Sequence, residues 1–102
     1  MKKRIRKHIL DFSKKTIDGK TIVSGIGKFT DSIGYPLSFL IDDLKEKNMV
    51  VDWIDYIEYS IEKKWGLNST LLKIEESLID SYGREYSNTV LEKINTYLLI
   101  RI

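Results

Sequence analysis

The chain has 102 residues, enough for one domain and too few for two of ordinary size. Its 42% hydrophobic and 31% charged residues are typical of a globular protein and exclude an intrinsically disordered one, and the absence of cysteine excludes disulfides. The net charge of +2 is unevenly distributed, because residues 1–28 carry nine Lys and Arg against two Asp (+7), whereas residues 29–102 carry eight against thirteen Asp and Glu (−5). A basic end on an acidic body indicates an anionic partner such as nucleic acid or a membrane surface.

The basic N-terminal segment predicts an amphipathic helix over residues 3–14. Its inward stripe consists of Ile5, His8, Ile9 and Phe12. Lysine and arginine at a helix start oppose the macrodipole, and a broken local rule of this kind sometimes marks a binding surface. After this helix, Asp18-Gly19 predicts a turn within residues 16–20.

Residues 21–30 allow two interpretations. The apolar stripe of a short helix would consist of Ile22, Val23, Ile26 and Phe29. Gly25 and Gly27 each weaken a helix by roughly 1 kcal/mol relative to Ala, so a helix here implies small residues pressed against a neighbour. We favour the short helix, with a strand as the alternative.

A central helix is predicted after a turn at residues 30–34. Its apolar stripe consists of Leu37, Leu40, Ile41 and Leu44. Pro36 suits the first helical turn, where a missing N–H costs nothing, and Asn48 suits the left-handed position after the helix.

Residues 51–61 fit a strand by alternation and a helix by spacing. We favour the helix, because Asp52 is placed to cap it, with Asp55 three residues later, and Gly66 is placed to end it.

Two further helices complete the predicted fold. One starts at Asn68-Ser69 and closes at Gly83, and the other is capped by Ser87 or Asn88. The apolar tail, residues 98–102, either returns to the core or meets another subunit. We therefore predict an all-α fold, a single helical domain over residues 1–102 built as a compact bundle of five to six short helices.

Enzymatic chemistry has no positive support, and we predict neither a cofactor nor a metal. Gly19-Lys20-Thr21 lacks the earlier glycine of a phosphate-binding loop, and His8 has no second histidine as a partner. No segment is apolar enough for a signal peptide or a membrane span, so we expect a cytoplasmic protein without a membrane partner. The absence of Ala and Gln beside fifteen Ile indicates an AT-rich genome, bacterial or phage.

Residues 22–50 resemble winged-helix and helix-turn-helix DNA-binding domains. Leu44 to Val50 is similar to the exit of a recognition helix, and Ile33-Gly34-Tyr35 is similar to the turn before it, giving a helix-turn-helix-like centre over residues 22–48. The resemblance implies DNA binding and transcription regulation. Asp42 and Asp43 depart from the family, because carboxylates repel phosphate, and no basic, glycine-bearing hairpin follows the helix as a wing.

Our leading hypothesis is a small DNA-binding or regulatory protein that contacts phosphates of double-stranded DNA through its basic N-terminal helix. The predicted phosphate-binding residues are Lys2, Lys3, Arg4, Arg6, Lys7 and Lys28. Base contacts would come from Ser38 and Lys45. A homodimer would form through the tail, by Leu98, Leu99, Ile100 and Ile102.

The competing hypothesis is a helical module without nucleic acid, a phage or plasmid accessory factor that binds a host or partner protein. Its working face would be the acidic, aromatic surface of residues 42–65, in which aromatic side chains left exposed would serve as anchors.

Overall fold

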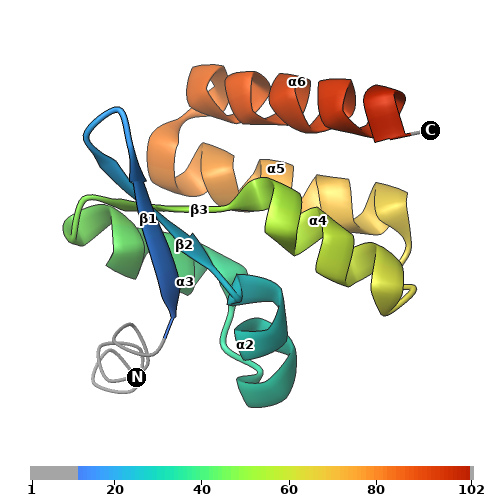
Figure 1. Ribbon diagram of the computed structural model, residues 1–102, viewed down its shortest axis with the longest axis horizontal. Coiled ribbons are helices and arrows are strands. Elements are labelled where there is room, and N and C mark those ends of the chain that lie inside the picture. The colour runs from blue at the N-terminus through green and yellow to red at the C-terminus, as the bar shows by residue number, and fades with distance from the viewer. Residues whose placement is uncertain (1–11, 102) are drawn as a thin grey trace.

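The computed structural model describes residues 12–101 of the chain, which form five helices and three strands (Figure 1). In chain order these are β1 (Ser13–Ile17), β2 (Lys20–Ser24), α2 (Ile26–Ile33), α3 (Leu37–Glu46), β3 (Met49–Val51), α4 (Trp53–Glu62), α5 (Leu67–Tyr82) and α6 (Arg84–Arg101). The fold is therefore mostly helical, with a small three-stranded sheet beside the helices.

The prediction of an all-α fold is wrong, because the segment after residue 12 forms a β-hairpin. Asp18 and Gly19 both have positive φ (53° and 78°), which makes them the two-residue turn that matches the twist of antiparallel strands. Thr21, Ile22 and Val23 are β-branched and pair along this hairpin. Ser13 and Lys14 of the predicted first helix belong to β1, Phe12 before them lies in a bend, and residues 3–11 lie outside the described residues.

The sheet has the order β1-β2-β3 and mixed pairing. β1 and β2 are antiparallel, with Ile17 opposite Lys20, whereas β3 runs parallel to β2, with Val51 opposite Val23. The parallel pairing requires a crossover, which α2 and α3 supply. β3 lies between α3 and α4 in the chain and pairs with β2, so it connects the hairpin to the helices.

Residues 21–30 combine both of the predicted alternatives. Residues 21–24 lie in β2, and α2 starts only at Ile26, after Gly25 with φ +90° has turned the chain. The predicted role of Gly27 is confirmed, since it is buried and a Cβ there would lie 2.9 Å from Cδ2 of Tyr59 on α4. The apolar stripe predicted for one helix is thus divided between β2 and α2.

The central helix is confirmed as α3, preceded by Pro36 and followed by Asn48 with φ +58°. The predicted cap of α4 is also confirmed, because Oδ1 of Asp52 accepts a hydrogen bond from the Asp55 N–H at 3.2 Å. α5 begins at Leu67, close to the predicted start, and Gly83 ends it.

The predicted caps of the last helix are wrong. α6 begins at Arg84, directly after Gly83, and Ser87 is fully buried inside its first turns. The Ser87 hydroxyl donates to the backbone oxygen of Glu75 on α5 at 3.3 Å. Packing between two antiparallel helices, rather than a cap, therefore fixes the position of this serine.

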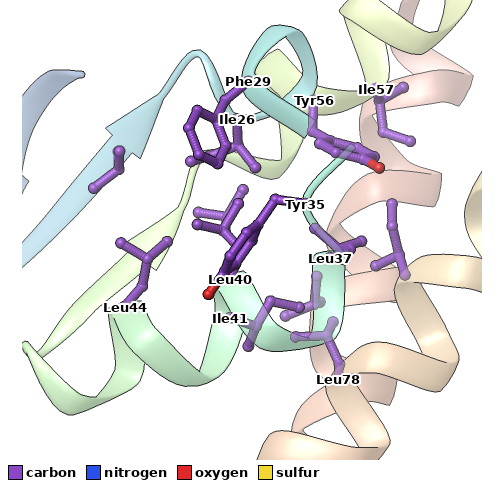
Figure 2. Close-up of a cluster of buried hydrophobic side chains, with 14 of the residues drawn as sticks. Ile26, Phe29, Tyr35, Leu37, Leu40, Ile41, Leu44, Tyr56, Ile57 and Leu78 are labelled. Carbon is purple, nitrogen blue, oxygen red and sulfur yellow. The ribbon is translucent and has the colours of Figure 1, made fainter. Parts of the chain in front are cut away.

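The core lies where the sheet, α2, α3 and α4 meet the inner faces of α5 and α6. Figure 2 shows Leu40 and Leu44 of α3 on the side of Ile26 and Phe29 of α2, whereas Ile41 lies beside Leu78 of α5. The remaining buried apolar side chains are Val23, Tyr35, Leu37, Val51, Tyr56, Ile57, Ile74, Leu78, Val90 and Ile94. Within residues 12–101, no helix is both long and apolar enough to cross a membrane.

Candidate nucleic-acid interface

The β1–β2 hairpin carries three exposed lysines within a short segment. All five residues of β1 are exposed, among them Lys14 and Lys15, and so is Lys20 at the start of β2. Asp18 in the turn is the one acidic residue within the hairpin. Figure 1 shows the hairpin at one side of the molecule, with its turn extending past β3. We call residues 13–24 the basic hairpin.

The lysines alternate between the two faces of β1, since successive side chains on a strand point to opposite sides. Lys14 lies opposite Val23, whose side chain enters the core, and Lys15 lies opposite half-buried Ile22 on the other face. Positive charge is therefore presented on both faces of the strand. An edge strand with lysines is also protected from pairing with a second copy of itself.

Two carboxylates of the α4 start hold the base of the basic hairpin. Oδ2 of Asp52 accepts a hydrogen bond from the Ser24 hydroxyl at 3.2 Å and lies 3.7 Å from Nζ of Lys15. Oδ2 of Asp55 accepts from the Gly25 N–H at 2.9 Å, at the junction of β2 and α2. The hairpin is thus attached to the helical body through α4.

Of the predicted phosphate-binding residues, the structure places only Lys28, which is exposed on α2. The others, Lys2, Lys3, Arg4, Arg6 and Lys7, lie outside the described residues, so their role stays a prediction. The sequence pattern did not assign Lys14, Lys15 and Lys20 to the site. The signal was present, because an Asp-Gly pair between β-branched runs is the strongest short-range indication of a hairpin.

The predicted base-contacting residues lie on a face of α3 that turns toward α5. Nζ of Lys45 donates to the backbone oxygen of Ser81 and lies 4.7 Å from the centre of the Tyr82 ring. Asp42 on the same face accepts from the Ser81 hydroxyl. Ser38 is half-buried at the start of the helix. This arrangement uses the polar face of α3 for packing within the domain.

The acidic segment, residues 42–65, also makes internal contacts. The carboxylate of Asp43 is buried and accepts from the Tyr35 hydroxyl at 2.7 Å. Burial, together with this neighbouring carboxylate, raises the pKa of Tyr35 to about 12. Glu58 accepts from the Tyr97 hydroxyl and, at 2.8 Å, from Nε of Arg101, and these hydrogen bonds lower the pKa of Glu58.

The predicted dimer interface is partly engaged in the fold. Leu98 packs against the core, whereas Leu99 and Ile100 are 77% and 79% exposed at the end of α6. Ile102 lies outside the described residues. Dimerisation through Leu99 and Ile100 stays a prediction.

A groove of about 460 Å³ lies between the α2–α3 turn and the start of α5, lined in part by Asp31, Trp65 and Lys73. Every buried side-chain nitrogen or oxygen in residues 12–101 has a hydrogen-bond partner. The same part of the chain contains no group of three His, Asp or Glu placed to hold a metal ion. The exposed lysines of the basic hairpin remain the clearest candidate site.

Comparisons of the chain with protein-family models, with curated proteins and with solved structures give no match.

Proposed function

We propose that this protein binds nucleic acid, and specifically the phosphate backbone of double-stranded DNA, through the basic hairpin. The observation that carries the proposal is that β1 is exposed along its whole length while it presents Lys14 and Lys15 on opposite faces. Lysine ammonium groups attract phosphates and release condensed counterions when they bind. Exposed Lys28 on α2 and the basic residues before position 12 add to the same positive end of the chain.

The proposed contact is to phosphates, with little reading of base sequence. Phosphate contacts position a protein on DNA, whereas base contacts from a groove-inserted element specify the sequence. α3 is poorly suited to that second task, because Asp42 and Lys45 on its polar face contact α5. The basic hairpin, with lysines as its main cations, suits sequence-independent binding.

The competing hypothesis, a protein-interaction module, has less support. Its working surface would use the carboxylates of residues 42–65, but Asp43, Asp52, Asp55 and Glu58 each accept hydrogen bonds within the domain. The contacts of Asp52, Asp55 and Glu58 hold α4 to the hairpin, to the start of α2 and to α6, and that of Asp43 holds Tyr35 to α3. We therefore assign the acidic segment a structural role.

The test compares binding of random-sequence duplex DNA at several salt concentrations. In one variant Lys14, Lys15 and Lys20 are replaced by Glu, and in the control variant exposed Lys64, Lys73 and Lys93 are replaced by Glu. Both variants have the same net charge, so a general charge effect would weaken them equally.

We expect the hairpin variant to bind far more weakly than the control. Its slope of log K against log salt should also fall by about 0.9 for each phosphate that the variant no longer neutralises. Equal binding by the two variants, or a slope unchanged from that of the original protein, would overturn the proposal. Circular dichroism of both variants establishes that they are folded.

A further inference from the structure

Asp52 occupies a position between the hairpin and α4 in which its two carboxylate oxygens have separate tasks. Oδ1 caps α4 by accepting from the Asp55 N–H, and Oδ2 accepts from the Ser24 hydroxyl and faces Nζ of Lys15 at 3.7 Å. The Lys15 side chain is 59% exposed, whereas that of Asp52 is only 18% exposed. The lysine is therefore open to solvent on the side away from its carboxylate.

We infer that Asp52 is an internal competitor for the phosphate that Lys15 would bind, so that it lowers the affinity of the basic hairpin for DNA. This inference rests on the proposed function. A carboxylate and a phosphate are both oxyanions that accept charge-assisted hydrogen bonds from a lysine. Binding then requires Nζ of Lys15 to leave Oδ2 of Asp52 for a phosphate oxygen.

The exchange is feasible because the pair is weak and Asp52 has other partners. An exposed ion pair contributes little to stability, since water and salt screen it. When Lys15 leaves, Oδ2 keeps its hydrogen bond from Ser24, and Oδ1 keeps the cap of α4. The hairpin thus remains attached to the body while its lysine turns toward DNA.

The charge of Asp52 also lowers the affinity for phosphate after Lys15 has moved. After the exchange, the Asp52 carboxylate stays negatively charged close to the bound phosphate and continues to repel it. Asp55, three residues later, has the same charge but accepts from the Gly25 N–H and makes no ion pair with Lys15. Asp55 therefore provides a control with the same change in charge and without the competing contact.

The experiment replaces Asp52 by Asn, which caps a helix about as well as Asp and can still accept from Ser24. Binding of random-sequence duplex DNA is measured at low salt for Asp52→Asn, Asp55→Asn, Lys15→Gln and the double variant Lys15→Gln/Asp52→Asn. We expect Asp52→Asn to bind about 1.4- to fivefold more tightly than the original protein, the range that an exposed ion pair spans.

We expect a smaller gain for Asp55→Asn, and a gain from Asp52→Asn that largely disappears when Lys15 is Gln. Equal gains for the two Asn variants, or an undiminished gain in the Lys15→Gln background, would overturn the inference. The proposed function is judged separately, by the triple-lysine variant and its control. If Asp52→Asn does not fold, Lys15→Gln is compared with Lys20→Gln, and the inference requires the smaller loss for Lys15→Gln.

Discussion

The replacement of Gly27 by Ala tests whether tertiary packing outweighs helix propensity in α2. In an exposed helix this change would stabilise by about 1 kcal/mol, because glycine is the poorer helix former. Here the new Cβ would lie 2.9 Å from Cδ2 and 3.0 Å from Cβ and Cγ of Tyr59. Tyr59 cannot easily retreat, since its hydroxyl donates to Asp31 at 2.8 Å and its ring meets Trp65.

Overpacking of this kind costs roughly 1–3 kcal/mol, so we expect Gly27→Ala to lower the free energy of unfolding by up to about 2 kcal/mol. For a domain of this size each kcal/mol corresponds to about 4–8 °C in Tm. Urea unfolding measures the effect in the original protein and in a Tyr59→Ala background, where most of the clash is removed. The packing argument is refuted if Gly27→Ala stabilises the original protein or costs the same in both backgrounds.

Two further predictions concern the core. Leu40→Ala removes a fully buried side chain and should lower the free energy of unfolding by about 2–5 kcal/mol in urea titrations, whereas a cost below about 1 kcal/mol would contradict its place in the core. Tyr35→Phe leaves the buried Asp43 carboxylate without its donor and should cost about 1–3 kcal/mol at neutral pH. Because the pKa of Tyr35 is raised from 10.0 to about 12, its contribution is complete below pH 10 and is lost as the pH rises toward 12, so the variant should lose stability less steeply in that range. An equally steep loss would contradict this assignment.

The sequence predicted the helices that carry their own local signals. α3 has an apolar stripe, a proline before it and a left-handed Asn48 after it, and α4 has Asp52 as its cap. In both cases local chemistry and burial agree, so the pattern alone is sufficient.

The hairpin was missed because two elements share one apparent stripe. Ile22 and Val23 lie in β2, while Ile26 and Phe29 lie in α2, and their spacing matches a helical period by coincidence. Gly25 with φ +90° separates the two elements, which the spacing of apolar residues does not reveal. The pairing of β3 with β2 was also not predictable, because it joins segments that are far apart in the sequence.

The sequence predicted only part of the candidate site, because some of its features depend on composition and others on tertiary structure. The excess of positive charge before residue 29 is a property of composition alone. Which lysines are exposed depends on the hairpin, and which carboxylates accept hydrogen bonds depends on tertiary contacts such as Asp43 with Tyr35. The sequence therefore indicated that the candidate site is positively charged. It assigned base contacts to Lys45, which packs against Tyr82.

The distribution of charge also determines how the proposed interface would work. The described chain measures 38 × 28 × 24 Å, whereas charges in physiological salt are screened over about 8 Å. Carboxylates that lie much farther than this from the basic hairpin would therefore have little effect on a phosphate bound there. They would act mainly when the helical body itself approaches DNA, and there they would oppose binding. If the proposed function holds, affinity would depend mainly on the carboxylates close to the lysines, such as Asp18 in the turn and Asp52 at the base, so local substitutions should matter more than net charge.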